Sequence, residues 1–359
     1  MAGAAVSAVE PSAETGQASE RSGAVRVRPT LSVTVLNYNY GSFLPQCIES
    51  ILGQTFRDFE LIVIDDCSSD NSVEIVQRYA HDPRLKLVAH TANVGYGGSL
   101  IEGTETHSSG EYVSVISADD LVRRPDAFER QLALLSAHPE AAFCFSGYEH
   151  FIHETGQVIK RHHSYEGDRL IPGREFLREY LTDQQVQVLH SGTVLRKSAY
   201  DCVGGYRRDL RMTLDFAMWP VLALQGDVAY CDEILYAYRA HGAQMSSSFS
   251  KQHANFVEVM KSVDGALNAA AQRGIPVGSL RGDAVRYALF AVALDDAFAG
   301  RPALAMYRSL SAVVLKPWPA LTSRGLWIIL ARLLLGERGF DALHTLLLGA
   351  PDTRPNWKR

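Results

Sequence analysis

Three short apolar runs, each typical of a β-strand, are followed by polar clusters that contain the residue types catalysis and ligand binding need. The clusters are Asn37–Gly41, Asp65–Asp70 and Ser117–Asp120. The second and third each hold two adjacent aspartates, and the first offers aromatic rings. A single acidic pair after a strand is commonly a cap or a turn. Two such pairs, with an aromatic residue at a third strand end, favour a functional site.

The pair Asp119 and Asp120 is suited to a divalent cation. Adjacent carboxylates stay ionised together only when solvent, hydrogen bonds or a cation stabilises them. Hard oxygen ligands suit Mg²⁺ or Mn²⁺ shared with a diphosphate. Asp66 can accept a hydrogen bond from a nucleobase N–H or a ribose hydroxyl, and Tyr38 offers a ring face on which a base could stack. Together these residue types predict a nucleoside diphosphate held through a metal ion.

The elements that would position these clusters alternate between strand and helix from residue 31. Apolar, β-branched runs predict strands at 31–36, 59–64, 85–89 and 112–116. Helical spacing predicts helices at 42–53, after the caps at 69–71, at 99–107, and from Pro125 to about Ala137. This alternation is typical of a parallel α/β sheet, in which ligands bind outside the carboxyl ends of the strands. The three polar clusters would meet at that edge.

The pattern continues less regularly towards the C-terminus. Further strands are predicted at 143–151, 190–196 and 228–238, helices at 174–182 and 214–224, and a loop or hairpin at 153–173. From about residue 249 to 348, Ala, Leu and Val recur with Arg and Asp at helical spacing. We expect a helical appendage there.

Several segments resemble the family-two glycosyltransferases of GT-A fold. LSVTVLNYNYGSFLPQCIESILGQTFRDFELIVIDDCSSDNSVEIV, NVGYGGSLIEG and GEYVSVISADDLVRRPD are similar to the nucleotide-binding half of that family, over residues 31–140. More weakly, GGYRRDLRMTLDFAMWPVLALQG and LYAYRAHGAQMS resemble its acceptor segment and the ending of that segment. The resemblance implies an α/β fold of GT-A type: a Rossmann-like, mostly parallel sheet with flanking helices, here followed by the helical appendage.

Composition and resemblance together suggest a domain organisation. Residues 1–28 are rich in Ala, Ser, Gly and Glu and cannot bury enough apolar area to order themselves, so we expect a disordered tail. The GT-A domain would span 29–248, with a nucleotide-binding half at 29–140 and an acceptor half at 141–248. The helical C-terminal region would span 249–359.

The resemblance also implies roles for individual residues. Tyr38 would stack on the base, and Asp66 would bond to it. The residues themselves predict a flexible approach near the nucleotide at the glycine-rich stretch 95–98, because no GxGxxG follows the first strand. The nucleotide-binding residues it implies are Asn37, Tyr38, Asn39, Asp66, Asn93, Gly97, Asp119 and Arg239. The metal ligands it implies are Asp119, Asp120 and His241. Which aspartate binds the metal directly stays open, because Ser117 stands where the family usually has another Asp. Asp215 falls at the position of the general base.

The activity implied is that of an inverting, metal-dependent glycosyltransferase. It would move a sugar from a nucleoside-diphosphate donor to a hydroxyl of a glycan or lipid-linked acceptor. UDP is the first choice for the nucleotide of the donor and dTDP the second. A divalent ion neutralises the departing diphosphate, and one carboxylate base without a second nucleophile fits inversion by single displacement. Two alternatives are a non-catalytic sugar-nucleotide or glycan-binding module and a nucleotidyltransferase. The second is disfavoured because Asn37–Gly41 contains no Lys or Arg.

The composition indicates which partners and which cellular location to expect. The 359 residues carry 35 Lys and Arg against 40 Asp and Glu, a net charge of −5, so we expect no nucleic-acid partner. The five cysteines are odd in number and never spaced as CxxC, which fits a reducing compartment better than disulfides or structural zinc. With no charged leader before an apolar run, we expect no secretory signal and a cytoplasmic protein, with the inner face of the membrane as a second location.

The C-terminal residues 316–348 are open to two interpretations. No apolar run reaches the 18–20 residues of a membrane span, and the longest, Leu326–Leu335, is interrupted by Arg332. The segment nevertheless combines tryptophans, leucines and a mild positive excess, as interfacial helices do. It would form either a peripheral membrane contact or a bundle packed on the catalytic domain or across a homodimer interface.

Overall fold

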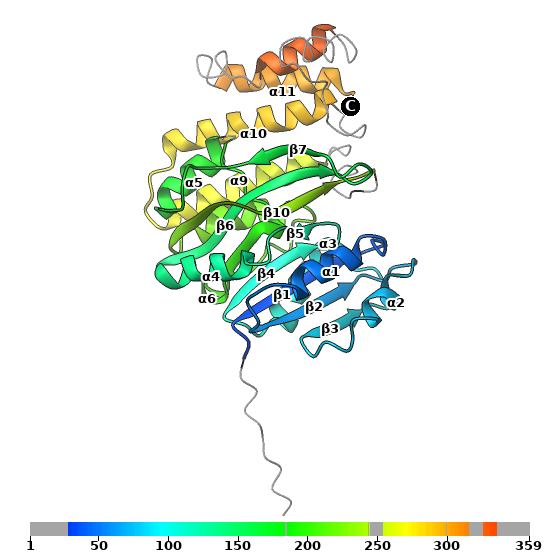
Figure 1. Ribbon diagram of the computed structural model, residues 1–359. Helices are drawn as coiled ribbons and strands as arrows, with labels where there is room; N and C mark the ends of the chain where they lie inside the picture. Colours follow the sequence, from blue (N-terminus) through cyan, green and yellow to red (C-terminus); the bar gives the residue numbers. More distant parts are fainter. Residues whose placement is uncertain are drawn as a thin grey trace, which may run out of the picture.

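The computed structural model describes residues 28–183, 185–242, 244, 254–298, 300–315 and 326–335 (Figure 1). The tail expected at 1–28 lies outside these residues apart from its last position. Most of the segment 316–348 lies outside them as well. One ten-stranded sheet runs through the molecule, in the order β3-β2-β1-β4-β9-β6-β10-β5, with β7 beside β6 and β8 beside β10.

The first half of the sheet is parallel, as the strand and helix alternation predicts. Its strands are β1 (Leu31–Asn37), β2 (Phe59–Asp65), β3 (Leu85–Ala89) and β4 (Tyr112–Ser117). They pair in the order β3-β2-β1-β4. The connecting helices are α1 (Leu44–Leu52), α2 (Ser72–Gln77) and α3 (Gly95–Glu102). The carboxyl ends of β1, β2 and β4 therefore meet at one edge.

The helix predicted at 99–107 begins earlier than the sequence suggests. α3 starts at Gly95 and continues into a π-helical turn over Gly103–His107. The glycine-rich stretch expected to be a flexible approach is thus the first turn of a helix. The cause is Asp66, whose carboxylate accepts the first backbone N–H groups of α3 from across the sheet edge. A helix leaves those donors without internal partners, so a fixed acceptor stabilises its start.

The second half of the sheet is mixed. β9 (Thr193–Arg196) runs antiparallel between β4 and β6 (Ala141–Ile152), and β6 pairs in parallel with β10 (Asp227–Ala240). The short strands β5 (Leu121–Val122), β7 (Val158–His162) and β8 (Arg169–Ile171) all pair antiparallel. The hairpin alternative for 153–173 is thus confirmed by β6 and β7. Strand 190–196 begins as a 3-10 turn, His190–Gly192.

Helices cover the sheet and extend beyond it. Those within the sheet region are α4 (Ala127–Ala137), α5 (Gly173–Thr182), α6 (Lys197–Cys202) and α7 (Leu214–Leu222). The expected C-terminal helices are present as α9 (Ala254–Gln272), α10 (Gly278–Phe298), α11 (Pro302–Leu315) and residues 326–335. α9 packs on α7 and α10 on α5. Figure 1 shows α10 and α11 at the end of the molecule opposite β1–β3.

Alternate strand residues fill two cores, one on each face of the sheet. Leu61 and Val63 of β2 pack with α1, whereas Ile62 and Ile64 pack with Leu100 of α3, all fully buried. This doubly covered arrangement explains why the β2 sequence is apolar without alternation. In the part of the chain that the structure describes, no helix is both long and apolar enough to cross a membrane.

Candidate functional site

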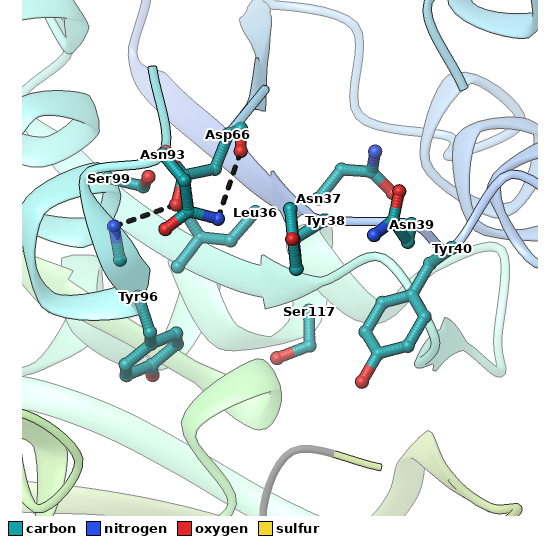
Figure 2. Close-up of a pocket in the computed structure, with 11 residues that line it drawn as sticks. Leu36, Asn37, Tyr38, Asn39, Tyr40, Asp66, Asn93, Tyr96, Ser99 and Ser117 are labelled. Carbon is teal, nitrogen blue, oxygen red and sulfur yellow. Dashed lines mark hydrogen bonds between the residues drawn. The ribbon is translucent and has the colours of Figure 1, made fainter. Parts of the chain in front are cut away.

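A cavity of about 450 Å³ opens at the carboxyl ends of β1, β2 and β4 (Figure 2). Five predicted nucleotide-binding residues line it: Asn37, Tyr38, Asn39, Asp66 and Asn93. Its wall also contains Tyr40 and Ser117 of the predicted polar clusters and Gly95 and Tyr96 of the glycine-rich stretch. The remaining two, Leu36 and Ser99, are not assigned to the site by the sequence analysis. Figure 2 shows Tyr96 and Tyr40 on opposite sides, with Ser117 between them. The structure therefore has a cavity at the sheet edge where the strand pattern predicts that ligands bind.

Asp66 organises one side of this cavity. Its Oδ1 accepts the Val94 N–H at 2.8 Å and faces His90 Nδ1 at 2.9 Å, and its Oδ2 accepts the Gly95 N–H at 2.8 Å. Gly95 has a φ of +81°, which only glycine adopts readily. The Asn93 amide also donates to the Asp66 carbonyl at 3.2 Å. Asp66 thus holds the start of α3, and a base could reach only the lone pairs its carboxylate has left.

The two asparagines that flank Tyr38 brace the neighbouring loop. Asn37 Nδ2 donates to Asp65 Oδ1 at 2.6 Å, and the Asn39 side chain accepts the Ser69 N–H at 2.8 Å. Asn39 has a φ of +58°, in the left-handed region that asparagine tolerates. Asn37 Oδ1 is buried and has no hydrogen-bond partner among the described residues. Tyr38 stays 49% exposed between them, so its ring is accessible.

The acidic pair after β4 divides into two different environments. Both carboxylates are buried, but Asp119 Oδ2 lies 3.0 Å from His241 Nε2. Asp120 instead accepts the Ser191 hydroxyl at 2.6 Å and the backbone N–H of Arg239 at 3.3 Å. Burial, and then the charge of Asp119, raise the pKa of Asp120 well above its ordinary value. One aspartate faces the histidine, and the other is held by the protein.

The predicted metal ligands fit only in part. The three do not converge, because no group of three or more His, Cys, Asp and Glu side chains suited to a metal ion occurs in the described residues. Asp119 Oδ2 and His241 Nε2 do fit, since two adjacent ligands of an octahedral ion at roughly 2.1 Å lie about 3.0 Å apart. Asp120 does not join them because Ser191 and Arg239 hold its carboxylate. With only Asp119 and His241 as protein ligands, most coordination positions of the metal ion would be left to oxygen atoms of the bound ligand.

Three of the predicted nucleotide-binding residues are not among those that line the cavity: Asp119, whose carboxylate faces His241, Arg239 and Gly97. Arg239 is 2% exposed, and its guanidinium lies between the Phe43 and Phe151 rings at 5.0 and 4.9 Å. Its Nε donates to the Asp119 carbonyl at 2.7 Å, so it braces the acidic loop from behind. Gly97 lies inside α3, where an added Cβ would meet Leu214 at 3.5 Å. A Cβ at position 97 would make an ordinary van der Waals contact, and Arg239 supports the backbone of the acidic loop.

Asp215 lies within electrostatic reach of the cavity. It is half-buried in the first turn of α7. Burial, then the charges of Asp215, Asp120 and Asp119 in that order, raise the pKa of Tyr96 well above its ordinary value. Tyr96 lines the cavity, so its ring lies near the predicted base and near the acidic pair together. Asp215 and the acidic pair therefore act electrostatically on the same side chain of the cavity wall.

Known proteins with similar sequences identify the family. Residues 32–204 match the profile of the family described as Glycosyl transferase family 2. EpsE of Bacillus subtilis (strain 168), named as a glycosyltransferase, is 30% identical over 217 residues, which cover 59% of this chain and 73% of EpsE. This chain is a family 2 glycosyltransferase. YibD of Escherichia coli (strain K12), also named as a glycosyltransferase, is 30% identical over 229 residues, covering 60% of this chain and 63% of YibD.

Solved structures confirm the fold of this family 2 glycosyltransferase. Residues 1–349 of S. aureus TarS in complex with UDP-GlcNAc superpose with a TM-score of 0.54 at 16% identity, over 80% of this chain and 92% of that TarS chain. The mannosyltransferase PcManGT from Pyrobaculum calidifontis, in complex with GDP-Man and Mn²⁺, gives 0.54 at 18% identity, over 89% and 84% of the two chains. At these identities the likeness supports the expected GT-A fold and no closer relationship.

The sequence analysis misses a hydrogen-bonded chain behind the cavity of this glycosyltransferase. Tyr96 Oη lies 2.9 Å from His190 Nδ1, and His190 Nε2 lies 3.0 Å from Tyr206 Oη. Next to His190, Ser191 donates to Asp120. No sequence signal predicts this, because Tyr96 and His190 are 94 positions apart. The 3-10 turn therefore joins the cavity wall, the acidic pair and the segment that precedes α7.

The buried His190 should make folding stability depend on pH. Burial lowers its pKa, so the folded protein keeps it neutral at a pH where an unfolded histidine, with a pKa of about 6.5, binds a proton. Stability is therefore full above about pH 6.5 and falls below it, by up to roughly 1.4 kcal/mol per pH unit. Urea unfolding of the wild type and His190→Gln at pH 7.5 and 5.5 tests this. The wild type should lose more stability than the variant, and an equal loss would contradict it.

Proposed function

We propose that this glycosyltransferase moves a sugar from a nucleoside-diphosphate donor, with UDP the first choice of nucleotide, to a hydroxyl of a glycan or lipid-linked acceptor, inverting the anomeric carbon. The observation that carries the proposal is the shared neighbourhood of three parts. The accessible Tyr38 ring and Asp119 lie at neighbouring strand ends, and the charges of Asp119 and Asp215 both act on Tyr96. Base, diphosphate and acceptor would each find a matching group.

The donor would bind in the cavity at the ends of β1 and β2. A base stacked on Tyr38 would lie beside Asp66 and beside Asn37, whose buried Oδ1 can accept a hydrogen bond. The volume of about 450 Å³ is within the usual range for small-molecule sites. Support for a nucleoside-diphosphate sugar also comes from TarS and PcManGT, whose structures hold UDP-GlcNAc and GDP-Man.

A divalent metal ion, Mn²⁺ or Mg²⁺, would be held by Asp119 and His241. When bound, it would neutralise the charge that develops on the departing diphosphate. Asp120 would keep the acidic loop in place through Ser191, and Arg239 would hold the same loop through the Asp119 carbonyl. Mn²⁺ in the PcManGT complex supports a metal in this fold.

Asp215 would act as the general base. It would take the proton of the acceptor hydroxyl while the acceptor oxygen forms a bond to the anomeric carbon. In the same step the bond from that carbon to the diphosphate oxygen breaks, and the diphosphate leaves with the electron pair. One displacement of this kind inverts the configuration. A half-buried carboxylate in the first turn of a helix, whose charge acts on Tyr96 of the cavity wall, is suited to it.

The acceptor would be a glycan or a lipid-linked molecule. Relatives include a chondroitin synthase from Pasteurella multocida, which is 25% identical over 219 residues that cover 21% of that protein. This similarity supports the proposal of a glycan acceptor.

Exposed Trp327, Leu334 and Leu335 support a peripheral membrane contact or homodimer through 316–348. All five cysteines are free thiols, which supports a reducing, cytoplasmic location.

Nucleotide binding tests the donor half directly. Calorimetric titration of the full chain with UDP, dTDP and GDP, each with Mn²⁺ and then with chelator, should give metal-dependent affinity for one nucleotide. Acceptor-dependent release of that nucleotide from its sugar conjugate would then separate an enzyme from a binding module. A folded protein that binds none of the three, with or without metal, would contradict the proposed donor site.

Removal of the Tyr38 ring should weaken nucleotide binding. Stacking of a base on an aromatic side chain contributes about 1–3 kcal/mol, so Tyr38→Ala should raise the nucleotide Kd by roughly 5- to 150-fold. Since Tyr38 is 49% exposed, the change should leave folding almost unaffected. Tyr38→Phe is the matched control and should bind almost as well as the wild type. Equal affinity of all three proteins would rule out stacking on this ring.

A further inference from the structure

Glu258 of α9 is a buried carboxylate that satisfies backbone donors of another element. It is 7% exposed, yet it has no basic partner in any ion pair between described residues. It accepts the N–H groups of Arg211 at 3.1 Å, Met212 at 3.0 Å and Thr213 at 3.2 Å, and also the Thr213 hydroxyl at 3.3 Å. Three consecutive N–H groups on one carboxylate form a built acceptor site.

These donors lie at the start of α7. Thr213 is the N-cap residue of α7, and its side chain makes no capping hydrogen bond of its own. Its hydroxyl instead lies 3.1 Å from Ser262 of α9. The Thr213 N–H, which lacks a partner inside α7, finds its acceptor on a helix 45 positions further along the chain, and the N–H groups of Arg211 and Met212 in the loop before α7 share that acceptor.

A second contact ties the same loop to α9. Arg207 donates from Nη1 to the Lys261 carbonyl at 2.7 Å. It passes so close to Gly265 that a Cβ there would lie 2.3 Å from the guanidinium. The stretch from Arg207 to Thr213 is therefore held by α9 at both ends. α9 lies outside the residues 32–204 that match the family profile.

We propose that Glu258 is a positioning residue for the transfer reaction, acting through the start of α7 on Asp215. The inference rests on the proposed role of Asp215 as the general base. Asp215 is two residues beyond the cap, so the orientation of its carboxylate follows the first turn of α7. The donor cavity is built from other elements and does not depend on Glu258. α9 is thus part of the catalytic unit and not only of a helical appendage.

Three variants test this. Glu258→Ala removes the acceptor, and a displaced base can cost about 100-fold in turnover. We expect that loss in acceptor-dependent turnover, with the donor Kd within about twofold of the wild type. Glu258→Gln keeps an amide oxygen as acceptor and should recover most of the turnover. The matched control is Asp264→Asn, which removes a carboxylate of the same helix that pairs with Arg281 and should change neither quantity.

A double variant separates positioning from general damage. In an Asp215→Asn background, Glu258→Gln and Glu258→Asp should cause no further loss of turnover, because they act through the missing carboxylate. These milder variants also serve if Glu258→Ala does not fold. Wild-type turnover in both Glu258→Ala and Glu258→Asp, a parallel loss of donor affinity, or a full further loss in the double variant would each overturn the proposal. If Asp215→Asn alone retains turnover, the assigned base fails, which is a distinguishable result.

Discussion

Replacement of Asp215 by Asn should lower acceptor-dependent turnover by about 10²- to 10⁴-fold, the usual contribution of a general base. The amide cannot take the acceptor proton, yet it has nearly the shape of the carboxylate, so the half-buried first turn of α7 should stay in place. The donor Kd should stay within about twofold, because the cavity that would hold the nucleotide is lined by residues before Asp120 in the chain.

The measurement is sugar transfer with a saturating donor, paired with calorimetric nucleotide binding on the same samples. Asp201→Asn is the matched control. It removes an exposed aspartate of α6 that pairs with Lys197, and should leave both quantities unchanged. Asp215→Asn with wild-type turnover would remove Asp215 as the base. A loss of donor affinity equal to the loss of turnover would place Asp215 in binding instead.

Removal of the Asp119 carboxylate should have the second large effect, on nucleotide binding in the presence of Mn²⁺. Loss of partners that only orient a metal ligand costs 10- to 100-fold in affinity, so loss of a ligand should cost about 100-fold or more. Asp119→Asn should therefore bind nucleotide almost equally with Mn²⁺ and with chelator. His241→Ala should show the same pattern, since the two donor atoms lie 3.0 Å apart.

Asp120→Asn provides the comparison that separates the two aspartates. Its carboxylate is held by Ser191 and by the Arg239 backbone, so the metal-dependent affinity should fall by less than the loss of about 100-fold or more expected for Asp119→Asn. A larger loss for Asp120→Asn than for Asp119→Asn would reverse their roles. If nucleotide binding still depended on Mn²⁺ in all three variants, the assignment of Asp119 and His241 as metal ligands would be wrong.

Local patterns were sufficient for the nucleotide-binding half. The apolar runs of β1, β2 and β4 each bury both faces, and that requirement is visible in their composition. Parallel strands joined by helices necessarily end at the same edge, so the strand pattern alone places Tyr38, Asp66 and Asp119 together. It does not place the start of α3, because the acceptor that stabilises that start is a side chain 28 and 29 positions away.

The acceptor half shows the limit of such patterns. Strands β5 to β10 mix directions, and their register is set by pairing partners far apart in the chain. Arg239 illustrates the consequence: the resemblance implies that it binds the nucleotide, and the structure buries its guanidinium between two phenylalanine rings, where it donates to the Asp119 carbonyl. The local sequence around a charged side chain does not indicate whether it will bind a ligand or support another part of the protein.

The sequence by itself determined the parallel half of the sheet and the clustering of polar residues at its edge, because these follow from periodicity and from strand ends that must meet. Its resemblance to known segments indicated the family. Only the tertiary structure determined which hydrogen-bond partner each of those residues has. Asp119 faces His241 from 122 positions away, Ser191 holds Asp120 from 71, and Glu258 reaches the start of α7 from 45. Hydrogen bonds depend on distance in space, and a buried carboxylate takes the donors that the packed chain brings to it.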